Sequence, residues 1–203
     1  SRLTEVLILS PRQRTAFEKY YPGCEPRLHQ VPPGISVDRR VDAIDKGIGT
    51  QLRIELGLGL NTKLLLQVGS GFRVKGVDRA LRAMAALPKP QLENCHYLLI
   101  GQDNPDRYLR LAKKLGIAEQ FTVLPGRDDI PRFLAAADLL LHPAYSESAG
   151  YVLLEATIAG LPVLTTSTCG YAFHIEHAES GLVCNDPFEQ AQLNSYLARM
   201  LGD

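Results

Sequence analysis

The feature that most constrains this chain is a regular alternation of short apolar runs with helical segments, which begins near Leu64. The apolar runs are nearly continuous and are bounded by turn residues, as expected for strands buried on both faces. They cover residues 63–69, 96–101, 121–126, 138–143, 161–166 and 181–184. Helical patterns lie between and after them, at residues 77–87, 105–116, 129–137 and 149–159, around 174, and at 188–201. The alternation predicts an α/β fold, a doubly wound parallel sheet in a Rossmann-like domain.

The first sixty residues follow this pattern less closely. Residues 5–10 are expected to form a strand and residues 11–21 a helix, before a Pro- and Gly-rich connector at 29–40. We therefore expect residues 1–40 to be the end of a preceding domain with its connector, and residues 41–203 to be the Rossmann-like domain. Because the chain starts without a methionine and enters an apolar run almost at once, we expect it to be a piece of a longer protein.

Composition narrows the classes of function. The chain has 22 basic and 22 acidic side chains, so its charge balance gives no reason to expect a nucleic-acid partner. The sequence contains neither a transmembrane run nor a signal peptide. Its four cysteines are scattered without a Cys-x-x-Cys pair, which favours buried free thiols and a cytoplasmic, reducing compartment.

A glycine-rich loop, "GSGFRVKG" at residues 69–76, follows the first of the strong strands. Gly69 lets a ligand approach the backbone, and Arg73 and Lys75 supply positive charge just before a helix, which predicts an anion site. The glycine spacing fits neither a dinucleotide fingerprint nor a P-loop. The alternative is a glycine turn with two solvated cations.

A second loop, "LPGRDD" at residues 124–129, places Arg127 after a Pro-Gly turn at the end of a strand. From there its guanidinium could lie against a planar base. Asp128 or Asp129 is expected to be the N-cap of the following helix.

A third loop opens the stretch "ESAGYVLLE" at residues 147–155. Glu147 precedes a helix that should begin near residues 149–150, and it could simply interact with the helix dipole. The first turn of that helix has free amides that can bind an anion. Small side chains before the helix would let a bulky ligand reach them. The residues concerned are Ser148, Ala149, Gly150, Tyr151 and Val152.

Glu155 lies about 8 Å further along the same helix. It could be a surface glutamate, but its neighbours Leu153, Leu154 and Ala156 leave little polar face. An acid in the interior needs a partner. A carboxylate accepts two hydrogen bonds from a vicinal diol, such as a ribose.

Histidines give weaker signals. His174 and His177 share a helical face, but we see no third ligand for a metal and expect none to be bound. His142, which precedes a proline at the end of a strand, is expected to be structural.

These motifs together resemble the retaining glycosyltransferases of the GT-B fold, family 4, also called group 1. The resemblance rests on "ESAGYVLLE" followed by "AGLPVLTT", on "VGSGFRVKGVDRAL", and on the connector "VPPGISVDRR". Strings such as "LLLQVGS", "KGVDR" and "AADLLLHPAY" are most similar to the lipopolysaccharide-core glucosyltransferases of this family. The likeness covers nearly the whole chain.

The resemblance implies the C-terminal, donor-binding half of a two-domain enzyme. Its donor would be a UDP-sugar, in the first place UDP-glucose, and its acceptor a lipopolysaccharide inner-core heptose held by the missing N-terminal domain. An acceptor in the inner membrane would imply peripheral attachment of the parent protein at the cytoplasmic face. The fragment alone is expected to bind the donor but to transfer little. The alternatives are a nucleotide-sugar-binding module and a Rossmann oxidoreductase domain.

The resemblance also implies roles for single residues. Lys75 and Glu147 would be catalytic, Lys75 with Arg73 at the diphosphate and Glu147 at the donor sugar. Glu155 would hold the ribose, Arg127 the uracil, and Arg39 would add a second cation from the connector. No metal or other cofactor is implied. The chain departs from the family at Ser70, where an arginine is frequent, and in "TCGYAFH", which lacks a Gly-Gly…Glu loop.

Overall fold

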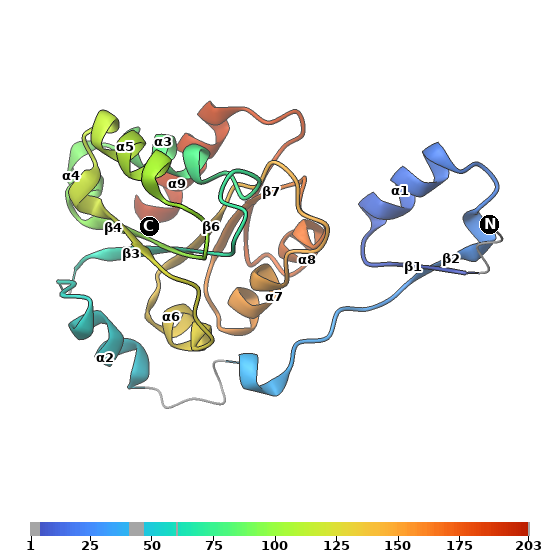
Figure 1. The fold of residues 1–203 in the computed structure, drawn as a ribbon, viewed down its shortest axis with the longest axis horizontal. Coiled ribbons are helices and arrows are strands. Elements are labelled where there is room, and N and C mark those ends of the chain that lie inside the picture. Colours follow the sequence, from blue (N-terminus) through green and yellow to red (C-terminus); the bar gives the residue numbers. More distant parts are fainter. Residues whose placement is uncertain (1–4, 41–46, 60, 203) are drawn as a thin grey trace.

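The computed structural model describes residues 5–40, 47–59 and 61–202. It contains a layered α/β body and a smaller N-terminal unit that stands beside it (Figure 1). The expected domain boundary after residue 40 adjoins residues 41–46, which lie outside the described residues, so that boundary stays a prediction.

The body is built on a parallel sheet of six strands in the order β5-β4-β3-β6-β7-β8. The strands are β3 (Lys63–Val68), β4 (Cys95–Ile100), β5 (Phe121–Leu124), β6 (Leu139–His142), β7 (Val163–Thr166) and β8 (Gly181–Cys184). The chain builds outward from β3 in one direction and then from β6 in the other. The topological switch point therefore lies between β3 and β6, where ligands bind in open α/β sheets.

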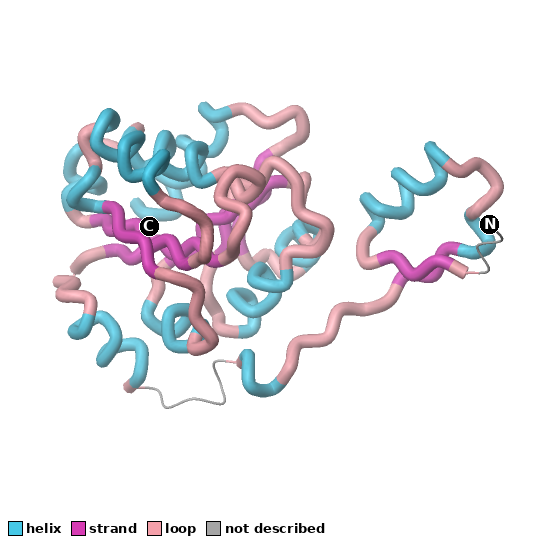
Figure 2. Tube along the Cα trace, in the orientation of Figure 1, coloured by secondary structure: helices cyan, strands magenta, loops and turns pink. Residues whose placement is uncertain are grey.

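Helices cover both faces of this sheet (Figures 1 and 2). One layer contains α3 (Val77–Ala85), α5 (Asp106–Leu115) and α9 (Gln190–Gly202), with the short α4 (Lys89–Glu93) at its edge. The other contains α2 (Ile48–Glu55), α6 (Ile130–Ala136), α7 (Tyr151–Ile158) and α8 (Ala172–His177). Alternate residues of each strand supply the two cores, as Leu64 and Leu66 do for one layer and Leu65 for the other.

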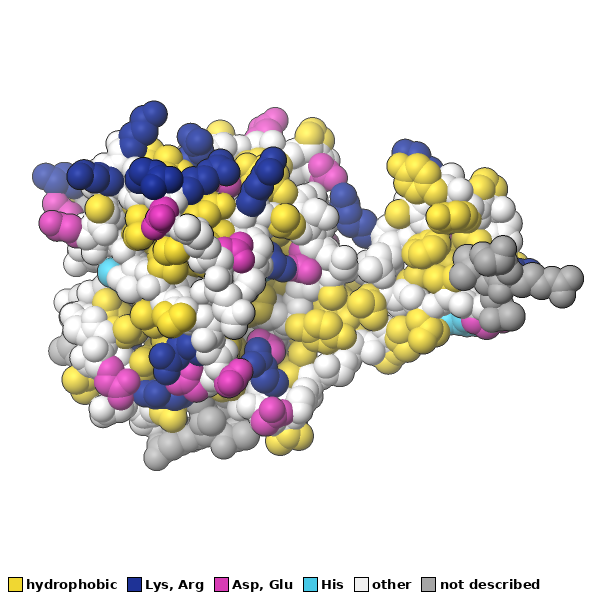
Figure 3. All heavy atoms as spheres, viewed as in Figure 1, with side chains coloured by type: hydrophobic (Ala, Val, Ile, Leu, Met, Phe, Trp, Pro, Cys, Tyr) yellow, Lys and Arg dark blue, Asp and Glu magenta, His cyan; other side chains and the backbone are white. Residues whose placement is uncertain are grey.

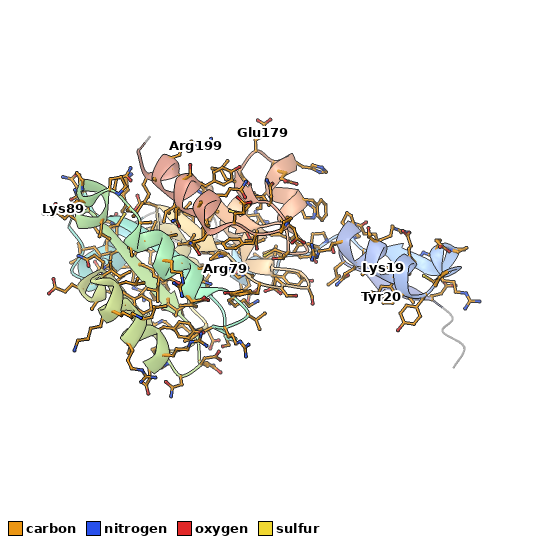
Figure 4. The ribbon with its side chains drawn as sticks, turned by 90° about the horizontal axis from the view of Figure 1, so that it is seen from above. Lys19, Tyr20, Arg79, Lys89, Glu179 and Arg199 are labelled. Atoms are coloured by element: carbon orange, nitrogen blue, oxygen red, sulfur yellow. The ribbon has the colours of Figure 1, made fainter. Side chains whose placement is uncertain are left out.

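The N-terminal unit is a small parallel βαβ arrangement. Strand β1 (Val6–Ile8) is followed by α1 (Pro11–Tyr20) and then by β2 (Leu28–Gln30), which pairs with β1. Seen from above, α1 carries Lys19 and Tyr20 well away from the body (Figure 4). At the other end of α1, Arg12 forms an ion pair with Asp186 at 3.3 Å, and the side-chain amide of Gln13 donates to the Ser148 carbonyl at 3.4 Å.

The predicted fold class is confirmed, with all six expected strands present. Several short elements were not predicted, among them the three-residue β2 and the five-residue α4. None of the described helices is long and apolar enough to span a membrane. Figure 3 shows basic side chains over the α3–α5 layer, and exposed residues of α5 contribute Arg107, Arg110, Lys113 and Lys114.

Candidate functional site

Two loops meet at the switch point, the one between β3 and α3 and the one between β6 and α7. Gly76 lies in the first with a left-handed φ of 71°, and a Cβ there would lie 2.0 Å from the Pro143 carbonyl oxygen of the second. Only glycine allows this approach. The Tyr145 amide also donates to the Val74 carbonyl at 2.7 Å. The two loops are therefore held in fixed register.

Three side chains converge where these loops meet. The Lys75 ammonium contacts the Glu147 carboxylate at Oε2, and the same oxygen lies 3.7 Å from Nε2 of His142. All three are shielded, with side-chain exposures of 20%, 15% and 1% respectively. Burial lowers the pKa of Lys75. Burial, together with the nearby Lys75 charge, lowers the pKa of His142 to about 3, so this imidazole is neutral at physiological pH.

The first turn of α7 lies directly beyond Glu147. Gly150 is its N-cap, with a left-handed φ of 94°. The loop after β7 braces this turn, because the Gly170 amide donates to the Glu147 carbonyl at 2.9 Å and the Tyr171 amide to the Ala149 carbonyl at 2.8 Å. A Cβ on Gly170 would lie 2.0 Å from the Ser148 carbonyl oxygen. The turn is thus rigid, and its first amides lack intrahelical partners, as in any helix.

The predicted helix-start residues differ in exposure. Ser148 is exposed, Ala149 and Gly150 are buried, Tyr151 is exposed and Val152 is half-buried. The ring of Tyr151 lies edge-on to that of Tyr171, with centroids 5.3 Å apart.

Glu155 is buried on α7, with 6% of its surface exposed, as its apolar neighbours predicted. Its partner is Arg39 of the connector, whose Nε donates to Oε1 at 2.9 Å and whose Nη2 donates to Oε2 at 3.3 Å. We expected Arg39 to add a second cation to the donor site from the connector. The structure instead pairs it bidentately with the acid that we expected to bind a ribose.

A cleft of about 290 Å³ runs beside this ion pair, and Arg39, Gly69 and Arg127 all line it. Ser70 and Gln102 also line this cleft, although the sequence did not single them out as ligand-binding residues. The Ser70 hydroxyl accepts from the Gln102 amide at 3.1 Å, which ties the β3–α3 loop to the end of β4.

Asp129 occupies the N-cap position of α6, but its side chain does not cap the helix, so the predicted capping bond is wrong. Its carboxylate accepts instead from Arg127, at 2.7 and 2.9 Å, and from Arg132 at 3.3 Å. The hydrogen bonds from Arg127 lower the pKa of Asp129. Charge-assisted bonds to two guanidinium groups replace the weaker bond to a backbone amide.

Arg73 lies apart from this group. It lines a separate cavity of about 360 Å³ with Arg107 and Tyr145. The structure therefore does not bring Arg73 together with the cleft that contains Arg39 and Arg127.

The other polar candidates have structural surroundings. His174 and His177 pack against Phe173, with ring centroids 4.0 and 5.8 Å apart. Among the described residues, no cluster of three or more His, Cys, Asp or Glu side chains could hold a metal ion. All four cysteines are free; three are buried and Cys24 is partly exposed.

We expected His142 to be structural, and the structure places it beside Lys75 and Glu147 at the switch point. A signal was present, since it is the polar end of an otherwise apolar strand that terminates beside the switch point.

A Rossmann-like sheet with a glycine-rich loop, a lysine and a carboxylate at its switch point defines a nucleotide-binding type of domain. Residues 50–203 match the family described as glycosyl transferases group 1. The chain belongs to this family, which confirms the resemblance of its motifs.

Relatives agree with this assignment. The chain is 44% identical to the lipopolysaccharide glucosyltransferase WaaG of Escherichia coli (strain K12), over 98% of this chain and 53% of that protein. It is 32% identical to the D-inositol 3-phosphate glycosyltransferase of Nocardia farcinica, over 87% of this chain and 40% of that protein. The chain thus spans about half the length of these relatives.

Solved structures show the same fold. The crystal structure of WaaG, a glycosyltransferase involved in lipopolysaccharide biosynthesis, superposes with a TM-score of 0.93 over 98% of this chain and 54% of that one. The Anabaena protein Alr3699/HepE, described in complex with UDP and glucose, gives a TM-score of 0.80 at 22% identity, over 98% of this chain and 52% of that one.

Proposed function

We propose that this domain binds a UDP-sugar, in the first place UDP-glucose, as the donor half of a retaining glucosyltransferase. The observation that carries the proposal is the meeting of Lys75 and Glu147 at the switch point, beside the cleft that contains Arg39 and Arg127. The 44% identity to a lipopolysaccharide glucosyltransferase supports the donor and the reaction type. A protein of the same fold is described in complex with UDP-glucose, so the fold can hold such a donor.

The diphosphate would lie at the first turn of α7, where backbone amides and the helix dipole favour an anion. Lys75 would then leave Glu147 and pair with the phosphates. As the bond between sugar and phosphate breaks, the ammonium stabilises the charge that develops on the leaving group. Glu147, released from its cation, would accept a hydrogen bond from a donor-sugar hydroxyl.

The nucleoside would occupy the cleft between Gly69 and Arg127. The Arg127 guanidinium is held in place by Asp129, which leaves its planar face for the uracil. Glu155 would accept from the ribose hydroxyls, because a carboxylate has more acceptor sites than the two that Arg39 occupies. In retaining transfer the acceptor attacks from the face that the diphosphate leaves, and the departing phosphate takes the acceptor proton. No metal ion or other cofactor is part of this proposal.

We further propose a lipopolysaccharide inner-core heptose as the acceptor, held by a second domain. This rests on the lipopolysaccharide glucosyltransferase relative. Transfer to an acceptor embedded in the inner membrane would place the whole protein in the cytoplasm, at the cytoplasmic face of that membrane.

Calorimetric titration of the chain with UDP, UDP-glucose, GDP and NAD tests the proposal. We expect UDP and UDP-glucose to bind more tightly than GDP or NAD. Lys75→Ala and Glu155→Ala should each weaken UDP binding about tenfold or more, since each removes a charged hydrogen-bonding partner. Lys89→Ala is the matched control, because this exposed lysine on α4 pairs only with Glu93 among the contacts described. Binding of NAD without a response to UDP would favour the oxidoreductase alternative.

A further inference from the structure

His142 is the most deeply buried titratable side chain at the switch point, and the roles proposed so far do not use it. It ends β6, and its carbonyl accepts from the Thr165 hydroxyl and the Ala144 amide, both at 2.9 Å. The backbone of His142 is therefore fixed from two sides. The imidazole that the strand holds here is fully buried.

The imidazole has no hydrogen-bond partner among the described residues. Both Nδ1 and Nε2 are inaccessible to solvent and unbonded. A neutral imidazole carries one N–H donor and one acceptor, and buried groups of this kind are normally paired. The atom nearest to a partner is Nε2, which faces Glu147 Oε2 at 3.7 Å.

Lys75 explains why this contact is long. Its ammonium already contacts the same Glu147 oxygen, so the carboxylate is neutralised without help from the imidazole. When an anionic ligand draws Lys75 away, Glu147 becomes a shielded carboxylate without a cation. An approach of less than about 1 Å would then bring Nε2 to hydrogen-bonding distance of Oε2.

We propose that His142 is a positioning residue that takes over Glu147 from Lys75 when the donor diphosphate binds. The Nε2–H group donates a hydrogen bond to Glu147 and keeps the carboxylate ionised and aimed at the donor sugar. No proton is transferred between His142 and Glu147 in this exchange. The inference rests on the proposed function, because it needs a diphosphate that attracts Lys75.

The test compares one substitution that keeps an N–H hydrogen-bond donor with one that removes it. His142→Gln can place an amide N–H where Nε2 lies, whereas His142→Phe keeps a ring without any donor. Both variants are titrated with UDP, and thermal unfolding checks that they fold. The dissociation constant of His142→Gln for UDP should lie within about threefold of that of the unsubstituted chain. His142→Phe should bind UDP roughly tenfold more weakly, the usual effect of losing a hydrogen bond to a charged group.

Proton uptake provides a second readout that a purely structural role would not change. Titration of UDP in buffers of different ionisation enthalpy should show additional proton uptake in His142→Phe, because Glu147 without a donor takes up a proton when Lys75 leaves. In a Glu147→Gln background, His142→Phe should change UDP affinity less than about twofold, since the two residues act as one unit. This background also separates a loss of positioning from a loss of packing.

Distinct results overturn the two proposals. If the unsubstituted chain binds no UDP, the proposed function and this inference both fail. If it binds UDP but the Phe and Gln variants behave alike, the inference alone fails. Equal losses from His142→Phe with and without Glu147 would likewise overturn it.

Discussion

Lys75 and Glu147 form an ion pair that the proposed diphosphate ligand would have to open. Each is mostly shielded from water, so neither can remain unpaired without a penalty. The pairing neutralises the two charges, and it would give the proposed diphosphate ligand a cation that is already desolvated in part.

The lowered pKa of Lys75 gives a prediction about pH. Below this pKa the ammonium is present and can pair with phosphate, and as the pH rises through it the charge is lost. UDP affinity should therefore fall with rising pH before the ordinary lysine value of 10.5 is reached. In Lys75→Arg the guanidinium stays protonated, so this part of the decline should vanish.

Calorimetry of the unsubstituted chain and of Lys75→Arg from pH 7 to 10 measures how UDP affinity changes with pH in each. Deprotonation of the uracil affects both proteins equally. Superimposable pH profiles would show that Lys75 does not carry the phosphate contact.

At the residue scale, the sequence predicted the burial of a side chain better than the partner that it contacts. Glu155 was expected to be buried from its neighbours alone. Its partner Arg39 lies 116 positions away and comes from the connector, a distance that no local pattern reveals. The contact of Lys75 with Glu147 depends in the same way on two loops brought together by strand pairing.

Among the elements, those with long buried surfaces were predicted well and short ones were not. A strand covered on both faces is apolar along most of its length, which makes β3, β4 and β6 visible as nearly continuous apolar runs. The three residues of β2 and the five of α4 are too few to show any period. Asp129 is the N-cap residue of α6, as predicted, but its side chain makes no capping bond because Arg127 and Arg132 bind the same carboxylate.

The glycine that locks the two loops together provides a test at the level of elements. Gly76→Ala would force a Cβ against the Pro143 carbonyl in addition to the strain of a left-handed residue. Gly116→Ala is the matched control, because Gly116 has a similar φ of 74° and open space around it.

We expect Gly116→Ala to lower the free energy of unfolding by about 1–2 kcal/mol, and Gly76→Ala by about 2 kcal/mol more. Chemical denaturation measures both values, and UDP titration should show weaker binding only for Gly76→Ala. Equal destabilisation by the two substitutions would mean that the loops do not need their close approach.

At the level of the whole molecule, the chain corresponds to about half of its glycosyltransferase relatives. Donor binding and sugar transfer should therefore be separable. The fold class followed from periodicity alone, whereas the relation between the N-terminal unit and the body did not. That relation depends on a few contacts distant in sequence, such as the exposed Arg12–Asp186 pair and the packing of Leu9 against the core of the body.

We expect the 203-residue chain to bind UDP-glucose but to transfer no detectable glucose to an inner-core heptose acceptor. Calorimetry measures the first property, and a radiolabelled transfer assay with a full-length relative as the positive control measures the second. Transfer by the chain alone would contradict the assignment of acceptor binding to another domain.

The pairing of β3 with β6 joins Leu65 to Leu139, residues far apart along the chain. Lys75 and Glu147 sit on loops that leave these two strands, so neither can find the other until this long loop of backbone has closed. The proposed nucleotide binding would then require the completed sheet. Nascent or partly unfolded chains would not bind the nucleotide. The amount of bound nucleotide would therefore measure the fraction of folded chains.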